Sequence, residues 1–161
     1  MNNTEIERKW SMDAFPPLPM ETESEMEQGY LCFSPNTVRI RKATQNGQSC
    51  YWLTIKGKGT LRRTEVEAPL RQDQYEALAT LLAVPMVRKK LRTYTLPGGH
   101  TLECSLVDEG EPTSFFYAEV EFSTVEQANL FVAPSFLGRD ITEEPGQTMA
   151  AYARRKAGLV P

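Results

Sequence analysis

The stretch Glu5-Ile6-Glu7-Arg8-Lys9 places two carboxylates and an ammonium group at alternate positions near the start of the chain. Side chains two apart on a β-strand share a face, so Glu5, Glu7 and Lys9 project together while Ile6 points the other way. The same spacing returns in Arg39/Arg41, Lys56/Lys58, Arg63/Glu65/Glu67, Lys90/Arg92 and Glu119/Glu121. In an ordinary sheet the charged face is exposed to solvent. So many tightly spaced charges of both signs indicate instead that the charged faces of different strands meet one another.

The size and composition of the chain are those of an ordinary globular protein. With 161 residues, 40% hydrophobic and 24% charged, we expect one domain over residues 1–161 with a sizeable core. The net charge of -3, from 18 Lys and Arg against 21 Asp and Glu, indicates no bulk attraction to nucleic acid. Any anion must therefore be bound by a local cluster of basic residues.

Two further features bear on where the protein works. No apolar stretch approaches the roughly 20 residues that span a bilayer, and the N-terminus lacks the apolar segment of a signal peptide. Cys32, Cys50 and Cys104 lie far apart without the spacing of metal ligands, which is typical of reduced thiols. We therefore expect a cytoplasmic protein with no membrane partner.

The pattern of alternation and turns predicts about eight strands and two or three helices. Asn46-Gly47 and Pro97-Gly98-Gly99 are typical hairpin turns, and the proline-containing segment Phe15–Glu27 is expected to be a connection. The predicted strands are Thr4–Met12, Gln28–Ser34, Thr37–Thr44, Ser49–Lys58, Leu61–Leu70, Val87–Leu96, His100–Val107 and Ser114–Ser123. The predicted helices are Gln72–Ala83, a short one ending at Phe131, and Thr148–Ala157. This inventory indicates a mainly β, α+β fold.

The parity of the charged residues predicts how the strands are arranged. About eight antiparallel strands close most simply into a single barrel. If the charged faces line its inside, apolar residues such as Ile6, Ile40 and Leu91 lie on the outer wall. A bare apolar wall would aggregate, so the helices should cover it, and a homodimer is a possible further cover. We therefore expect an eight-stranded antiparallel closed β-barrel tunnel with a few helices packed outside.

A tunnel lined with charges of both signs suits a metal–polyphosphate complex. Arg and Lys side chains bind phosphate oxygens, and clustered carboxylates bind hard cations such as Mg²⁺ or Mn²⁺. Phosphoryl transfer needs both, because the phosphates must be neutralised and positioned for attack by water. The basic residues at inward parity are Lys9, Arg39, Arg41, Lys56, Arg63, Lys90 and Arg92, and the acidic ones are Glu5, Glu7, Glu65, Glu67, Glu103, Glu119 and Glu121.

Six ordered elements resemble the pattern of a known family. Glu5-Ile6-Glu7-Arg8-Lys9 matches the Glu-x-Glu-x-Lys signature of CYTH domains, the triphosphate tunnel metalloenzymes. The other elements, at residues 38–41, 54–57, 63–67, 90–92 and 118–121, follow in the family's order. The stretch around Tyr30 resembles the one that carries a tyrosine in the short bacterial members, which include inorganic tripolyphosphatases. Any one element alone is more often a solvated strand face, but the ordered set is specific.

The resemblance implies an enzyme that hydrolyses a linear triphosphate, with inorganic tripolyphosphate giving pyrophosphate and phosphate, and that uses Mg²⁺ or Mn²⁺. The carboxylates that would hold metal are Glu5, Glu7, Glu119 and Glu121, with Glu65 or Glu67. The cations that would bind the phosphates are Arg39, Arg41, Lys56, Lys90 and Arg92. Glu103 and Arg63, at the same parity, are assigned with them. Lys9, paired with Tyr30, would assist proton transfer at the phosphate under attack or act only as a phosphate clamp.

Two departures from the family pattern concern the metal site and the end of the tunnel. In Glu103-Cys104-Ser105 a serine stands where the family usually has aspartate. Asp108 lies at the opposite parity, so it could substitute only through a bulge. Near the C-terminus, Gln147-Thr148-Met149 replaces the usual Tyr-x-Asn. Because of these changes, a polyphosphate-binding module that has lost catalysis remains an alternative function.

Thiamine triphosphatase and class IV adenylate cyclase, which share the tunnel, are the alternatives within the family. Tyr30 and Tyr94 are the only aromatic residues expected at inward parity beside the basic cluster, so little indicates a nucleobase pocket. Inorganic tripolyphosphate is therefore the favoured substrate, with nucleoside triphosphates as poorer ones.

Overall fold

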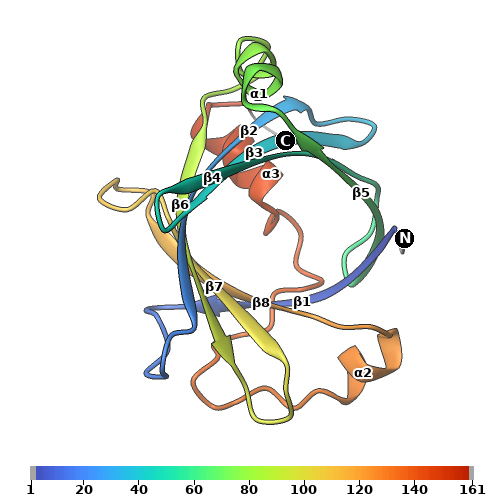
Figure 1. Ribbon diagram of the computed structural model, residues 1–161. Coiled ribbons are helices and arrows are strands. Elements are labelled where there is room, and N and C mark those ends of the chain that lie inside the picture. The colour runs from blue at the N-terminus through green and yellow to red at the C-terminus, as the bar shows by residue number, and fades with distance from the viewer. Residues whose placement is uncertain (1–2, 160–161) are drawn as a thin grey trace.

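The computed structural model describes residues 3–159, and its eight strands close into an antiparallel barrel (Figure 1). The strands are β1 Thr4–Met12, β2 Thr22–Cys32, β3 Thr37–Gln45, β4 Gln48–Lys56, β5 Arg62–Leu70, β6 Val87–Thr95, β7 Thr101–Val107 and β8 Phe115–Glu121. Around the barrel they follow the order β1-β5-β4-β3-β2-β6-β7-β8. The predicted fold, a closed eight-stranded barrel, is confirmed.

Strand β2 is longer than the sequence pattern predicts. The segment Phe15–Glu27 is not wholly a connection, because β2 begins at Thr22, soon after the last proline of the segment. Its glutamates face the outward cations of β6 across the ladder, with Glu23 opposite Arg92 and Glu25 opposite Lys90. Opposite charges facing each other stabilise a strand pair, so an acidic run here extends the sheet.

The main apolar core lies outside the barrel, on the wall formed by β1, β6, β7 and β8. Trp10, Leu102 and Val120 are buried in this core. Helix α2, Val125–Leu130, and the chain that follows it cover the wall (Figure 1), and the ring of Phe131 packs 5.6 Å from that of Trp10. The predicted inversion, with charges inside and the core outside, holds on this side of the barrel.

The wall formed by β3, β4 and β5 is less completely covered. Ile55 and Val66 face each other across the β4–β5 ladder and are 40% and 43% exposed. Helix α1, Gln72–Ala79, ends before the predicted Ala83 and contacts β3 and β4. Its Tyr75 ring lies 5.0 Å from that of Tyr51, so α1 covers only part of this wall.

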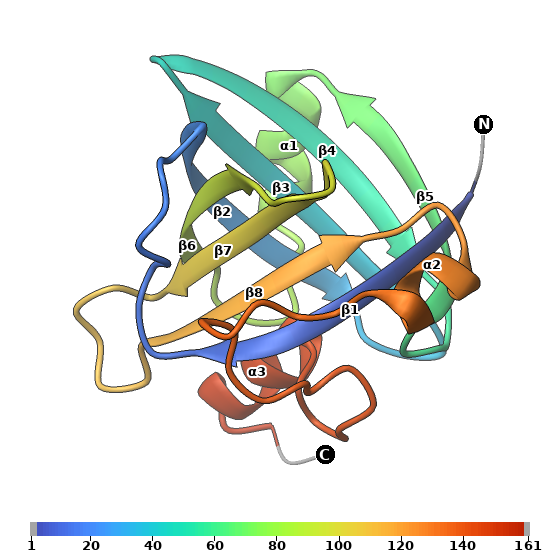
Figure 2. The same ribbon diagram turned by 90° about the horizontal axis from the view of Figure 1, so that it is seen from below.

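One end of the barrel is covered by helix α3, Met149–Lys156 (Figure 2). Its inner face meets apolar and aromatic side chains from the inside of the strands. We call this cluster the floor, and its buried residues are Tyr30, Val84, Val87, Val107, Tyr117, Met149, Tyr152 and Ala153. None of the helices within residues 3–159 is long and apolar enough to cross a membrane.

Asp108 fixes α3 to the barrel. Its buried carboxylate accepts hydrogen bonds from the Tyr152 hydroxyl at 2.6 Å and from Lys156 Nζ at 2.8 Å, both on α3. It also accepts one from the backbone N–H of Arg88. The residue has a φ of 46°, a left-handed conformation that ends β7 and turns the carboxylate toward the helix. Asp108 therefore does not take the place of the family's tunnel aspartate.

Candidate active site: the charged tunnel

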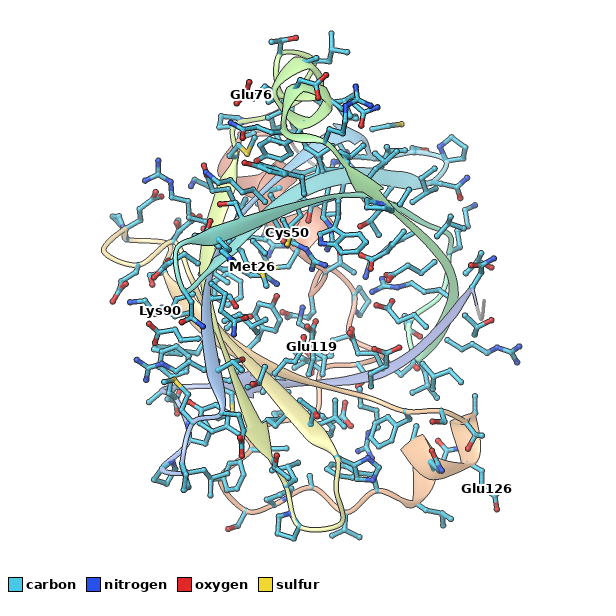
Figure 3. All side chains as sticks on the ribbon, viewed as in Figure 1. Met26, Cys50, Glu76, Lys90, Glu119 and Glu126 are labelled. Atoms are coloured by element: carbon cyan, nitrogen blue, oxygen red, sulfur yellow. The ribbon has the colours of Figure 1, made fainter. Side chains whose placement is uncertain are left out.

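A cavity of about 480 Å³ lies inside the barrel above the floor. Side chains from all eight strands and from the segment before α3 line it, and Thr142, Gln147 and Thr148 belong to that segment. Figure 3 shows Glu119 in the middle of the barrel, whereas Glu76 and Glu126 lie outside on helices. The predicted site residues that line the cavity are Glu5, Glu7, Lys9, Tyr30, Arg39, Arg41, Lys56, Arg63, Glu65, Glu67, Glu103, Glu119 and Glu121.

The inward parity predicted for β6 is wrong. Lys90 and Arg92 point outward, where Lys90 Nζ pairs with Glu109 at 2.9 Å and Arg92 Nε with Glu23 at 2.7 Å. Lys89 and Leu91 line the cavity instead. The reason is the apolar outer core, because Tyr94 and Leu96 are buried in it and place every even-numbered position of β6 on the outside.

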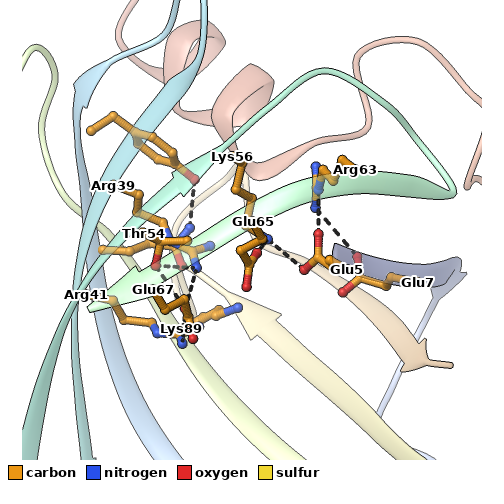
Figure 4. Close-up of polar contacts among 12 residues, drawn as sticks. Glu5, Glu7, Arg39, Arg41, Thr54, Lys56, Arg63, Glu65, Glu67 and Lys89 are labelled. Atoms are coloured by element: carbon orange, nitrogen blue, oxygen red, sulfur yellow. Dashed lines mark hydrogen bonds and ion pairs between the residues drawn. The ribbon is translucent and has the colours of Figure 1, made fainter. Parts of the chain in front are cut away.

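Two cations tie the carboxylates of one side of the cavity together (Figure 4). Lys56 Nζ lies 2.9 Å from Glu5 Oε1 and 2.6 Å from Glu65 Oε2. Arg63 pairs closely with Glu5 and reaches to within 3.9 Å of Glu7. Burial alone would raise the pKa of Glu5, but Lys56 and Arg63 outweigh it and lower that pKa to about 2. Glu5 is therefore an ionised carboxylate held between two cations.

Glu7, two residues further along the same face, is in the opposite situation. Burial and the neighbouring Glu119 and Glu5 raise the pKa of Glu7 well above its ordinary value. Its cross-strand partner is Glu121, whose pKa is raised by burial and by the surrounding carboxylates. The pKa of Glu103 is raised by burial and by Glu119. This side of the cavity thus gathers more negative charge than its own cations neutralise.

These carboxylates do not form a ready-made metal centre. Within residues 3–159, no three acidic, His or Cys side chains converge closely enough to hold a metal ion as they stand. Repelling carboxylates of this kind nevertheless match the oxygen ligands that Mg²⁺ and Mn²⁺ prefer. The donor chemistry therefore fits a divalent cation, provided that the side chains move closer together.

The arginine side of the cavity presents donors with spare hydrogen-bonding capacity. Arg39 and Arg41 share Glu67, at 3.9 and 3.4 Å, and Arg39 also reaches the Thr54 hydroxyl. The Nε–H groups of both arginines are buried without a hydrogen-bond partner. Burial and the adjacent Arg39 lower the pKa of Arg41. Two cations held this close, each with an unused donor, form a site suited to an anion.

Lys9 and Tyr30, the predicted catalytic pair, both line the cavity. Lys9 Nζ lies 3.6 Å from Glu119 and 4.0 Å from the centre of the Tyr117 ring. The Tyr30 hydroxyl accepts a hydrogen bond from Gln28 Nε2 at 2.9 Å. The aromatic ring beneath the Lys9 ammonium is therefore that of Tyr117.

Lys89 and Tyr117, which line the cavity and contact each other, are not among the site residues predicted from sequence. Tyr117 shares the face of Glu119 and Glu121 in the alternation of β8, a signal that the sequence contains. Lys89 is harder to find, because it lies in a run of three basic residues that puts charge on both faces of β6. Tyr94, expected inside, is buried in the outer core.

Comparisons with known proteins agree with this architecture. No family model matches the chain. The chain is 30% identical over 141 residues to an inorganic triphosphatase of Nitrosomonas europaea, covering 88% of this chain and 91% of that protein. The crystal structure of an inorganic triphosphatase superposes with a TM-score of 0.63 at 25% identity, over 98% of this chain and 95% of the other. A Pyrococcus horikoshii protein shares the fold, with a TM-score of 0.59 and 21% identity over 78% of this chain and 82% of its own.

The likeness in sequence thus extends over most of both proteins. The likeness in structure includes the barrel whose interior carries the Glu-x-Glu-x-Lys signature on β1. We conclude that the chain belongs to the CYTH family of triphosphate tunnel metalloenzymes.

Proposed function

We propose that the protein hydrolyses inorganic tripolyphosphate inside the tunnel, releasing pyrophosphate and phosphate with the help of a divalent metal. The observation that carries this proposal is the division of one cavity between unused arginine donors and mutually repelling carboxylates. A linear triphosphate needs cations along its length, and its metal ion needs carboxylates. The names of the sequence relative and of the matching crystal structure, both inorganic triphosphatases, support the same substrate.

The phosphate-binding residues in this proposal come from four strands and differ in part from those inferred from sequence. Arg39 and Arg41 on β3 offer their free Nε–H groups. Lys89 on β6 takes the role inferred from sequence for Lys90 and Arg92, because it is the cation of that strand that lines the cavity. Lys56 and Arg63 stand between the two sides, paired with glutamates, and can exchange carboxylate for phosphate oxygen.

The metal, Mg²⁺ or Mn²⁺, would be held by Glu7, Glu119 and Glu121, with Glu5, Glu65, Glu67 or Glu103 beside them. Bound there, it would neutralise negative charge on the phosphates. Release of Glu5 and Glu65 from Lys56, as that lysine turns to the substrate, would free further oxygen ligands. Binding of the phosphates and of the metal would therefore reinforce each other.

Hydrolysis then requires water to add to a terminal phosphorus while the bridging P–O bond breaks. Pyrophosphate leaves with the electron pair of that bond, and the proton of the water passes to a product oxygen. Lys9, held beside Glu119 and over Tyr117, is placed to donate to the phosphate under attack. Tyr30, at the floor near Arg39, is proposed to support it.

The test is phosphate release from tripolyphosphate, with Mg²⁺, with Mn²⁺ and with EDTA, by wild type and by Glu7→Gln. We expect metal-dependent turnover that falls roughly 100-fold or more in the variant, because metal binding loses a central ligand. Glu126→Gln, on the outer helix α2, is the matched control and should behave as wild type.

Thiamine triphosphate and ATP are assayed in parallel, with cyclic nucleotide measured as a product of ATP. Preferred turnover of thiamine triphosphate, or cyclisation of ATP without phosphate release from tripolyphosphate, would replace the proposal with the corresponding alternative. Tight metal-dependent binding of tripolyphosphate without turnover would indicate a binding module. The homodimer, the cytoplasmic location and the single domain inferred from sequence remain predictions.

A further inference from the structure

Tyr117 lies between two lysines of the tunnel and touches both of them. The ammonium of Lys9 lies over the face of its ring, 4.0 Å from the ring centre. The ammonium of Lys89 donates a hydrogen bond to its hydroxyl at 2.9 Å. Both lysines line the cavity, one from β1 and the other from β6, on either side of β8 and β7 in the barrel. One side chain therefore contacts cations from two separate strands.

The ring itself has little freedom to move. Tyr117 is 1% exposed and belongs to the floor, where Phe115 and the α3 residue Tyr152 form part of the same aromatic packing. Its backbone lies in the middle of β8, paired with Ser11 on one side and Ser105 on the other. The apolar part of the ring is thus anchored in the floor while its face and hydroxyl meet the charged cavity.

The two lysines need such a partner for different reasons. Lys89 is 7% exposed, and a buried ammonium group is costly unless it is hydrogen bonded. The Tyr117 hydroxyl supplies the acceptor. Lys9 is more open to the cavity, and the negative face of an aromatic ring attracts a cation from one direction without neutralising it. Lys9 is also paired with Glu119 at 3.6 Å, and the phenol orients both lysines without adding a further negative charge.

We propose that Tyr117 is a positioning residue that sets Lys9 through its ring and Lys89 through its hydroxyl, so that both ammonium groups bear on the same bound polyphosphate. This inference rests on the proposed function, in which Lys9 acts at the reacting phosphate and Lys89 binds phosphate. It assigns separable tasks to two parts of one side chain. Loss of the hydroxyl affects the binding lysine, and loss of the ring also affects the reacting one.

The experiment compares Tyr117→Phe and Tyr117→Leu with wild type, measuring kcat and KM for tripolyphosphate with saturating metal. Tyr117→Phe keeps the ring and removes the acceptor of Lys89, so KM should rise roughly 10-fold while kcat stays within about twofold. Tyr117→Leu also removes the ring beneath Lys9, so kcat should fall by a further factor of about 10. A tyrosine that only fills the floor would not separate KM from kcat in this way.

Tyr94→Phe is the matched control, because Tyr94 is equally buried but lies on the outer wall. It should leave both constants unchanged. Circular dichroism and thermal melting identify a variant that fails to fold, and Tyr117→Met, which keeps an apolar side chain in the floor, then replaces Tyr117→Leu. Wild-type constants in both Tyr117 variants, or parallel changes of kcat and KM in both, would overturn the inference.

Failure of the proposed function gives a different result. If wild type binds tripolyphosphate but does not hydrolyse it, the triphosphatase proposal falls. The inference about Lys89 is then tested by calorimetry with tripolyphosphate and Mg²⁺. In that case Tyr117→Phe should raise the Kd for tripolyphosphate roughly 10-fold, and an unchanged Kd would refute the inference.

Discussion

The inner and outer walls of the barrel are built from the same strands but carry opposite kinds of interaction. On β1, Glu5, Glu7 and Lys9 face a cavity of charges, while Ile6 and Trp10, between and beside them, face the apolar core. The outer wall buries apolar surface, which is the main source of folding free energy. The inner wall holds charges that are costly to bury and are kept for binding. Substitution of an outward residue should therefore lower mainly stability, and substitution of its inward neighbour should lower mainly activity.

The largest effect is expected on the outer wall, from Trp10→Ala. Trp10 is 1% exposed and packs on Phe131, so its removal leaves a large cavity. We expect the free energy of unfolding to fall by about 3–5 kcal/mol, measured by urea denaturation. Lys9→Met, the inward neighbour, should change it by less than about 1 kcal/mol while abolishing turnover. Equal losses of stability in the two variants would erase the distinction between the walls.

The next effect concerns the pH dependence of stability in the metal-free protein. The Glu5 pKa of about 2 is below its unfolded value, so the stability that Glu5 contributes is present above pH 4.5 and is lost as pH falls toward 2. At pH 7 Glu5→Gln should lose about 3 kcal/mol, and the difference should vanish near pH 2. Urea titrations in EDTA across pH 2–7 measure it.

Glu7→Gln should show the opposite sign in the same titrations. The Glu7 pKa is raised in the folded protein, so Glu7 lowers stability progressively as pH rises above 4.5. The glutamine variant should therefore gain stability relative to wild type toward neutral pH. Identical pH profiles for the two variants would mean that the two carboxylates share one environment.

A smaller effect distinguishes two adjacent lysines of β6. Lys89→Met removes a cation of the cavity and should lower kcat/KM for tripolyphosphate by roughly 10- to 100-fold. Lys90→Met removes an outward ion pair with Glu109 and should stay within about twofold of wild type, because exposed ion pairs contribute little. The reverse result would restore the register that the sequence pattern favours.

The smallest effect is expected where the outer wall is least covered. Ile55→Thr keeps a β-branched side chain at a position that is 40% exposed, so the free energy of unfolding should change by less than about 1 kcal/mol. Ile40→Thr, on the neighbouring strand but fully buried, should cost more. Sedimentation of both variants at several concentrations shows whether a second subunit covers Ile55. A dimer that dissociates only in Ile55→Thr would assign this wall to the predicted homodimer.

Much of this fold can be predicted from the sequence, because charged residues that face the inside of the barrel alternate with apolar residues that face the outside. Strand β1 is predicted to the residue, and the cavity gathers the inward glutamates as the parity requires. The predicted orientation of β6 is wrong, because a run of basic residues puts charge on both faces of this strand. Only Tyr94 and Leu96 indicate which face packs on the outer apolar core.

The individual partners inside the tunnel could not be predicted. Which carboxylate Lys56 and Arg63 hold depends on the stagger between β1 and β5, strands that are distant in sequence. The role of Asp108 depends on a left-handed turn and on a helix that arrives later in the chain. The sequence pattern gives a face for each residue, whereas these contacts need the closed barrel.

Closure of the barrel pairs its first strand, β1, with its last strand, β8. Glu7 on β1 lies opposite Glu121 on β8, and Lys9 opposite Glu119. These partners are more than about a hundred residues apart, and such distant pairings form late in folding and slowly. Until β8 has been synthesised and docked, β1 has no partner along that edge and the carboxylate cluster lacks Glu119 and Glu121. During refolding, the ability to hold metal and phosphate should consequently appear only with the final kinetic phase, and no partly folded chain should display a fraction of it.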